Sequence, residues 1–156
     1  MNTTTPSPAP NRPPMGRAAR ALLAASLLLY LVAMFTAPFR TGAPQPHPWA
    51  DGWQVLLTGW MGVFAGIYAW LANPLVLAAW LLTLKRHRTQ AVVLAVLALL
   101  VGTSFLTQHR ILVNEAGDVE PVHLDAIGYW CWLASFGAAA VAAALLPGRT
   151  TTRAAG

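Results

Sequence analysis

Residues 52–84 read GWQVLLTGWMGVFAGIYAWLANPLVLAAWLLTL, and no charged side chain interrupts this run. An α-helix needs about 20 apolar residues to cross the hydrocarbon core of a bilayer, which is about 30 Å thick. Asp51 precedes the run and Lys85 and Arg86 follow it. The run therefore predicts a transmembrane helix with one acidic and one basic end. As a single continuous helix it would measure roughly 50 Å at ~1.5 Å per residue, so it has to tilt, bend or protrude.

Similar apolar runs lie on both sides of this one, and each is long enough to cross a bilayer. Together with residues 52–84 they predict an all-α fold, a four-transmembrane-helix bundle that occupies residues 18–148. The other three predicted helices are residues 18–38, 90–108 and 126–147.

Both ends of the chain fall outside the predicted bundle. Residues 1–17 hold five prolines among polar residues, a composition that buries too little apolar surface to fold. We therefore expect a disordered Pro-rich N-terminal tail, and a second tail at residues 149–156. The first apolar run also resembles a signal peptide, but Met34 and Phe35 stand where a cleavage site needs small residues, so we expect that helix to be retained.

The charges are divided between the gaps in a way that predicts topology. All five acidic residues fall in the two gaps after the first and third runs, whereas Lys85 and most arginines lie in the other gap and the tails. Cytoplasmic segments retain Lys and Arg, so the pattern predicts a multi-pass protein of the inner (cytoplasmic) membrane with both termini cytoplasmic. The Arg- and Ala-rich composition favours a bacterial source. Because the net charge of +5 sits beside the ends of the runs, it points to lipid headgroups, and no nucleic-acid partner is expected.

An Asn-Pro pair interrupts the long run. Counting back from Lys85 places Asn73 and Pro74 near the bilayer midplane. Pro74 has no N–H, so the carbonyl of Trp70 loses its usual partner and the helix should kink. We predict that Asn73 forms an intramembrane polar site with side chains of other helices, as a packing clamp, a ligand pocket or a hinge. The candidate partners are Ser26, Tyr30 and Ser135.

Small residues recur along two of the runs. Gly59 and Gly66 lie seven residues apart, and Gly62 and Gly66 have the small-x-x-x-small spacing that lets helices approach closely. Gly128 begins a similar row in the last run. We predict that the second and fourth helices pack along these rows, or that one row contacts a second copy of the chain.

The second outer gap contains the residues with most potential for chemistry. His109, His123 and Asp125 are metal-ligand types and form a weak candidate metal site, although we favour an acidic, solvated loop as their explanation. Two short extended segments in this gap predict a small hairpin. The single cysteine, Cys131, excludes an intramolecular disulfide.

Two short segments resemble parts of small, uncharacterised bacterial four-helix inner-membrane proteins. They are WLANPL at residues 70–75 and GYWCWLAS at residues 128–135. The resemblance covers the second to fourth predicted helices and implies that the Asn-Pro pair and the Tyr-Trp cluster belong to one architecture. It brings no known activity.

No group of residues in the sequence names a reaction. Gly-x-Ser-x-Gly, His-Glu-x-x-His and phosphate-loop motifs do not occur, and the hydrocarbon-spanning segments lack the ionisable residues that ion transporters use. We therefore predict no catalytic residue and no cofactor. The leading hypothesis is a non-enzymatic accessory, scaffold or partner-binding subunit whose partners are the lipid bilayer and a membrane protein or a second copy. The alternatives are an enzyme or metal-binding protein that uses the outer His/acid loop, and a small-molecule or lipid-binding cavity around Asn73.

Overall fold

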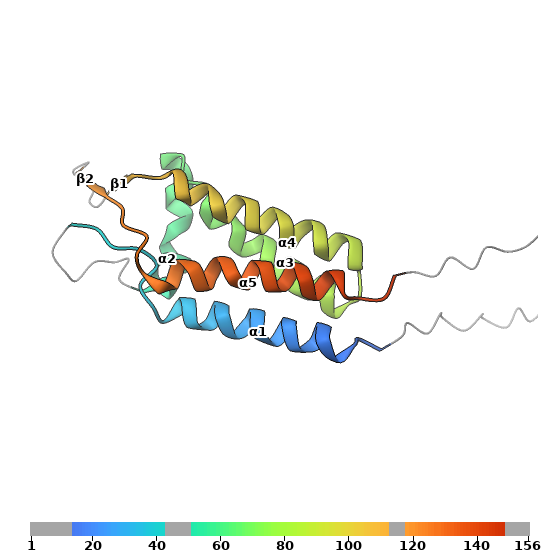
Figure 1. The fold of residues 1–156 in the computed structure, drawn as a ribbon. Coiled ribbons are helices and arrows are strands. Elements are labelled where there is room, and N and C mark those ends of the chain that lie inside the picture. Colours follow the sequence, from blue (N-terminus) through green and yellow to red (C-terminus); the bar gives the residue numbers. More distant parts are fainter. Residues whose placement is uncertain (1–13, 43–50, 113–117, 149–156) are drawn as a thin grey trace, which may run out of the picture.

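The protein folds as a bundle of helices that lie side by side along one axis (Figure 1). The computed structural model describes residues 14–42, 51–112 and 118–148, and the two tails predicted from the sequence fall mostly outside this range. The elements of the bundle are α1 (Arg17–Met34), α3 (Ala72–Leu84), α4 (Arg88–Thr103) and α5 (Ile127–Ala144). A short 3₁₀ turn, η3 (Ser104–Thr107), continues α4.

The bundle core is built from small side chains, which lets the helices approach closely. Helix α5 packs against α1 and α4, and α4 packs against α3. Positions three or four residues apart lie on one face of a helix, and in α4 these buried positions hold a row of small residues that was not predicted from the sequence. The row consists of Ala91, Ala95, Ala98 and Gly102.

The structure agrees with the prediction of a mostly helical protein with membrane-type helices. In the described part of the chain, three helical segments are long and apolar enough to cross a bilayer: Arg17–Met34, Arg88–Thr107 and Ile127–Ala144. A shorter apolar segment, Ala69–Leu84, accompanies them.

The prediction of one helix over residues 52–84 is wrong. The chain instead forms α2 (Gly52–Thr58) and the 3₁₀ helix η1 (Gly59–Ala65), turns at Gly66, and resumes with η2 (Ala69–Leu71) and α3. Gly66 has a φ of 80°, a left-handed conformation that glycine adopts without steric cost. The N–H of Ile67 donates to the Gly62 carbonyl at 2.8 Å and closes this helix end. Hydropathy gives no sign of the break, because the turn itself is apolar.

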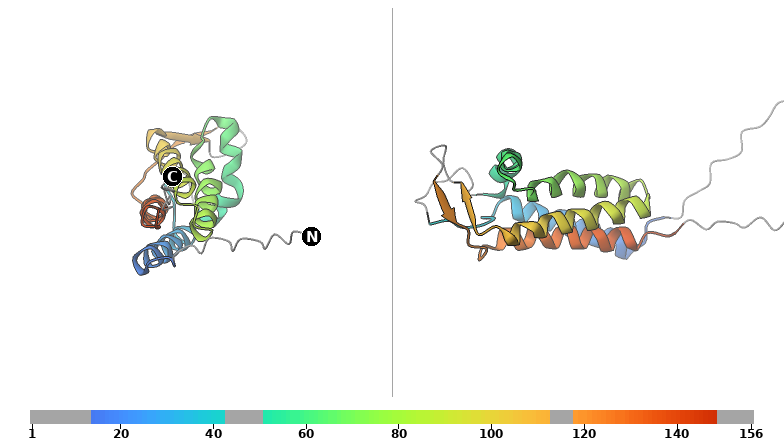
Figure 2. Two further views of the ribbon diagram at one scale, coloured as in Figure 1. Left: turned by 90° about the vertical axis from the view of Figure 1, so that its right-hand side faces the viewer. Right: turned by 90° about the horizontal axis from the view of Figure 1, so that it is seen from above.

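Residues 52–65, which we term the transverse arm, run across the bundle rather than along it. In Figure 1 the arm crosses one end of the bundle, and in the right-hand view of Figure 2 it is seen end-on. The Gly52 N–H donates to the Thr36 carbonyl just after α1 (3.1 Å), and Trp70 Nε1 donates to the Leu56 carbonyl (2.8 Å). The arm begins after Asp51, whose N–H donates to Gln54 Oε1 in a capping box. The bonds to Thr36 and from Trp70 hold the arm against this end of the bundle.

A short hairpin covers the same end of the bundle. Strands β1 (Arg110–Leu112) and β2 (Val119–Pro121) pair antiparallel, with Ile111 opposite Glu120. The backbone of Arg40 pairs with that of His123 through two hydrogen bonds of 2.9 Å and joins the loop after α1 to this hairpin. The predicted hairpin is therefore present, and we refer to this end of the molecule as the outer end.

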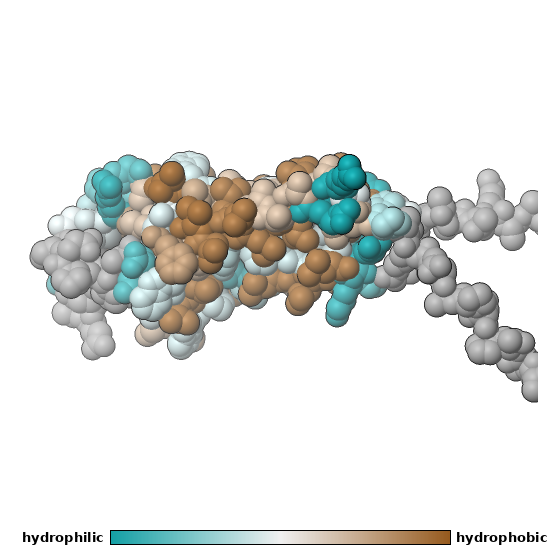
Figure 3. All heavy atoms as spheres, turned by 90° about the horizontal axis from the view of Figure 1, so that it is seen from below, coloured by the Kyte–Doolittle hydropathy of each residue, from teal (hydrophilic) through white to brown (hydrophobic). Residues whose placement is uncertain are grey.

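The opposite, inner end carries basic residues. The first turn of α1 and the tight turn between α3 and α4 lie there, next to the C-terminal end of α5 (Figure 1). These two segments supply Arg17, Arg20, Lys85, Arg86 and Arg88. Between the two ends the face drawn in Figure 3 is mostly apolar, and each bundle helix carries exposed apolar side chains, among them Leu28, Leu81, Leu100 and Val141. The molecule thus has an apolar belt between polar ends.

Candidate apolar cavity at the outer end

A cavity of about 500 Å³ lies between the transverse arm and the outer ends of the bundle helices. Its volume falls within the range of about 300 to 1,000 Å³ that is typical of small-molecule sites. Apolar side chains form most of its wall. They come from the end of α1, the arm, η2, η3, β1 and the start of α5, and they include Met34, Phe39, Met61, Ile67, Phe105 and Ile111.

The cavity exists because the chain turns back at Gly66 and the arm presents small residues to the space beneath it. Gly59, Gly62 and Ala65 all contribute to the wall. A methyl group on Gly59 would come within 2.8 Å of Trp70 Cδ1, and one on Gly62 within 3.4 Å of Ile67 Cβ. Both glycines face the segment that follows the arm. Gly59 has to be small for this contact, whereas a side chain at Gly62 would make ordinary van der Waals contact. The prediction that they pack against the last helix is wrong.

Asn73 forms the polar part of the cavity wall and is only 5% exposed. Its Oδ1 accepts hydrogen bonds from the Tyr30 hydroxyl and from Trp132 Nε1, both at 2.9 Å. Its Nδ2 donates to the Trp70 carbonyl at 3.0 Å. An indole N–H can only donate and a carbonyl can only accept, so these partners fix the orientation of the amide. One side chain thereby links α1, α3 and α5.

The structure changes the interpretation of the Asn-Pro pair. Pro74 is the third residue of α3, where a missing N–H is tolerated, rather than the middle of a continuous helix. The predicted mid-helix kink is therefore replaced by a helix start. The Trp70 carbonyl that Pro74 leaves free is bound by the Asn73 side chain.

A second polar group lies deeper in the bundle and does not include Asn73. The Ser26 hydroxyl donates to the Ser135 carbonyl at 2.7 Å and accepts a hydrogen bond from Trp80 Nε1 at 2.9 Å. Of the three partners predicted for Asn73, Tyr30 reaches it, whereas Ser26 and Ser135 bind each other. Trp80 and Trp132 were not predicted as members of either group. The signal that could have found them is an indole N–H inside a predicted span, where each such donor needs an acceptor.

Gly128 lies at the contact between α5 and the end of α1. Its N–H donates to the Ala37 carbonyl at 3.2 Å, and a side chain at this position would collide with that same carbonyl. Gly52 approaches the Ala33 carbonyl in the same way. The predicted close approach at Gly128 is thus directed at the first helix, and the predicted packing of the second and fourth helices along their small rows is wrong.

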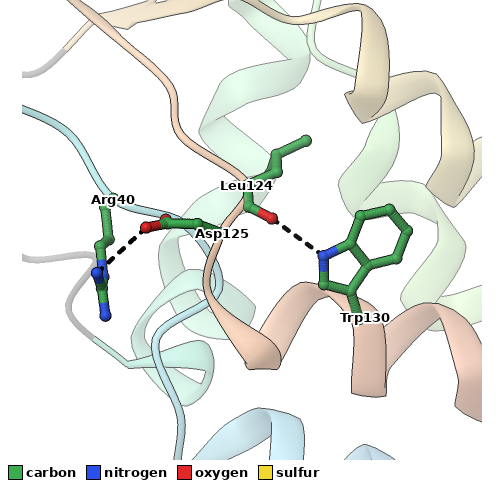
Figure 4. A network of polar contacts seen from close by, with 4 residues as sticks. All are labelled: Arg40, Leu124, Asp125 and Trp130. Carbon is green, nitrogen blue, oxygen red and sulfur yellow. Dashed lines mark hydrogen bonds and ion pairs between the residues drawn. The ribbon is translucent and has the colours of Figure 1, made fainter.

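Of the three outer residues proposed as metal ligands, Asp125 forms an ion pair instead. Asp125 Oδ2 lies 3.2 Å from Arg40 Nη1, and Trp130 Nε1 donates to the Leu124 carbonyl at 3.0 Å (Figure 4). The Arg40 and Asp125 side chains are 67% and 58% exposed, so the pair contributes little to stability. His109 and His123 are also exposed. Among the described residues no three His, Cys, Asp or Glu side chains come together as a metal site.

The features that bear on function are therefore the apolar cavity and the polar wall centred on Asn73. No protein-family model matches this chain, and no curated protein or solved structure matches it either.

Proposed function

We propose that this protein is a non-enzymatic, multi-pass membrane protein that holds one apolar molecule in the cavity beneath the transverse arm. The observation that carries the proposal is a 500 Å³ space with an almost wholly apolar wall at the outer end of a membrane-type bundle. Burial of apolar surface contributes about 25 cal/mol per Å², so a hydrocarbon chain in this space would be held without any charged contact. Of the three functions that the sequence leaves open, the geometry favours the apolar cavity.

The proposed membrane placement is supported by the distribution of charge and hydropathy. The basic turn at Lys85 and Arg86 and the start of α1 share one end, and the apolar belt separates them from Glu120 and Asp125 at the other. Because Lys and Arg remain on the cytoplasmic side, we place the inner end in the cytoplasm and the outer end on the opposite side of a bacterial inner membrane.

The short segment Ala69–Leu84 would be the fourth span. At about 1.5 Å per residue it measures roughly 24 Å, less than a hydrocarbon core of about 30 Å. The transverse arm would compensate for this by lying in the outer interface above the end of α3. Its exposed Trp53 and Trp60 support that depth, because tryptophan is enriched where the bilayer meets water.

The wall of the cavity is suited to binding rather than to reaction. Its polar groups serve backbone carbonyls or each other: Thr58 Oγ1 donates to the Gln54 carbonyl at 2.8 Å, and the Tyr129 hydroxyl donates to the Gly102 carbonyl at 3.2 Å. Among the described lining residues none is charged at neutral pH. An accessory or partner-binding role is compatible with this proposal, because a bound lipid can form part of the surface that contacts a partner protein.

Photolabelling of the full-length protein in lipid nanodiscs tests the proposal. The probe is a long-chain alkane that carries a diazirine, and mass spectrometry maps the labelled residues. We expect labelling of buried cavity residues such as Phe105 and Ile111 that is competed by unlabelled octadecane. Labelling of lipid-facing Leu28 and Leu100, which are 63% and 60% exposed, should not saturate in this way.

A variant that fills the cavity can be compared with a control variant that carries the same substitution outside it. Ile67→Trp places a larger side chain at a half-buried position of the cavity wall, whereas Ile127→Trp makes the same change at an exposed position of α5 outside it. The first variant should lose the saturable labelling and the second should keep it. Equal labelling of both variants, or no saturable labelling in the unaltered protein, would overturn the proposal.

A further inference from the structure

We infer that the molecule in this cavity is a neutral carbonyl compound, an apolar body that bears one oxygen acceptor, and that Asn73 Nδ2 donates a hydrogen bond to that oxygen. The inference rests on the proposed function, because it names the class of ligand for the same cavity. It arises from the hydrogen-bonding capacity of one buried amide.

A primary amide has two lone pairs on its oxygen and two N–H donors on its nitrogen. Both acceptor positions of Asn73 Oδ1 are used, by the Tyr30 hydroxyl and by Trp132 Nε1. One of the two donors is used, by the Trp70 carbonyl. Within the described part of the chain the second N–H of Nδ2 meets no acceptor.

The burial of Asn73 makes this remaining donor significant. The residue is 5% exposed and lines the cavity. Buried polar groups in proteins are almost always hydrogen-bonded, because an unpaired donor in an apolar environment is costly. The other side-chain donors of the wall already have acceptors: Trp70 Nε1 binds the Leu56 carbonyl and Tyr129 binds the Gly102 carbonyl. Among the side-chain N–H and O–H donors of the described wall, the second N–H of Asn73 is therefore the one left without an acceptor.

The absence of charged side chains among the described lining residues narrows the class of ligand further. A carboxylate or phosphate would need a cationic partner to leave water, and among the described lining residues there is none. An ammonium group would need an anion, which the described lining residues also lack. The complementary ligand is thus neutral, and its acceptor lies within or beside its hydrocarbon part. Long-chain ketones, esters and quinones share this chemistry.

A pair of matched competitors tests the inference in the full-length protein. Methyl pentadecyl ketone and octadecane have the same number of non-hydrogen atoms, and only the ketone carries an acceptor. Each is titrated against the alkyl-diazirine probe in nanodiscs. We expect the ketone to halve cavity labelling at a roughly two- to tenfold lower mole fraction than octadecane, the effect of one neutral hydrogen bond.

Two substitutions separate the amide donor from general effects on the wall. Asn73→Leu removes the donor and should make the two competitors equivalent. Tyr30→Phe removes a partner of Oδ1 at a residue that does not line the cavity and leaves Nδ2 in place, so it should retain the preference for the ketone. In addition, the infrared carbonyl band of bound, ¹³C-labelled ketone should lie at lower frequency in the unaltered protein than in Asn73→Leu.

The comparison in the unaltered protein needs no substitution and decides the outcome by itself. Equal competition by ketone and octadecane would overturn the inference, with water satisfying the amide, and would leave the proposed function intact. If neither compound competes with the probe, both the inference and the proposed function fail.

Discussion

Asn73 Nδ2 donates a hydrogen bond to the carbonyl oxygen of Trp70, 3.0 Å away. In a helix this carbonyl would normally accept from the backbone N–H of the residue four positions later. That position holds Pro74, which has no N–H to give. The side chain that precedes the proline therefore replaces the backbone hydrogen bond that the proline removes.

Because the Asn73 side chain replaces the backbone donor that Pro74 lacks, we expect the effects of substitutions at Asn73 and Pro74 on the free energy of unfolding to be non-additive. Asn73→Leu leaves the Tyr30 hydroxyl and Trp132 Nε1 without their acceptor and takes the side-chain donor away from the Trp70 carbonyl. We expect it to lower the free energy of unfolding by about 2 to 4 kcal/mol. Pro74→Ala restores a backbone N–H for the Trp70 carbonyl. The double variant should therefore be about 1 kcal/mol more stable than the sum of the single effects.

Unfolding by sodium dodecyl sulfate in mixed micelles measures all four proteins of this cycle. Additive effects of the two substitutions would contradict the proposed exchange of donors.

The deeper serine predicts a separate loss of stability. The Ser26 hydroxyl is fully buried and joins Trp80 Nε1 to the Ser135 carbonyl. Ser26→Ala leaves Trp80 Nε1 without its acceptor and removes the side-chain donor to the Ser135 carbonyl, and it should cost about 1 to 3 kcal/mol. Ser104→Ala, at an exposed position whose hydroxyl bonds the preceding helical turn, should change the free energy of unfolding by less than about 0.5 kcal/mol. Equal effects of the two substitutions would show that the Ser26 contacts contribute nothing.

Two glycines of α5 predict opposite effects of the same substitution. Gly128→Ala would force a methyl group into the Ala37 carbonyl and should cost more than about 2 kcal/mol or shift the end of α1. A methyl group on Gly137 would meet no atom within 4 Å, so Gly137→Ala should raise the free energy of unfolding by about 0.5 to 1 kcal/mol through helix propensity. Thermal unfolding in detergent compares the two variants, and a stable Gly128→Ala protein would contradict the close approach of α5 to α1.

Substitutions of His109, His123 and Asp125 should have little effect on stability or on binding in the cavity. Asp125→Asn removes an exposed ion pair with Arg40 and should change stability by less than about 1 kcal/mol. Replacing His109 and His123 by alanine should leave the saturable labelling of the cavity unchanged, because neither residue lines it. Loss of labelling in the double alanine variant would instead support a role for the outer His/acid loop.

The sequence predicts the bundle helices well because long, uninterrupted apolar runs are typical of membrane-type helices. The apolar runs at 18–38, 90–108 and 126–147 correspond to α1, α4 with η3, and α5. Hydropathy fails for residues 52–84, where an apolar segment changes direction. The left-handed turn at Gly66 depends on backbone conformation, which an uninterrupted apolar run does not reveal.

The polar wall was predictable only in part for a related reason. Asn73 stands out in the sequence because an amide inside a span needs partners, and Tyr30 was among the candidates. Trp132 was not, because tryptophan at a predicted helix start is equally expected as an interfacial anchor. The cavity itself depends on the path of the transverse arm, so it could not be derived from residues 52–84 treated as one straight helix.

Native mass spectrometry of the full-length protein, extracted gently from the membrane in which it is made, tests the central claim most directly. One neutral apolar molecule should be retained per chain in the unaltered protein and in Ile127→Trp, and it should be lost in Ile67→Trp. A chain that carries no such molecule, or that retains it equally when the cavity is filled, would contradict the account.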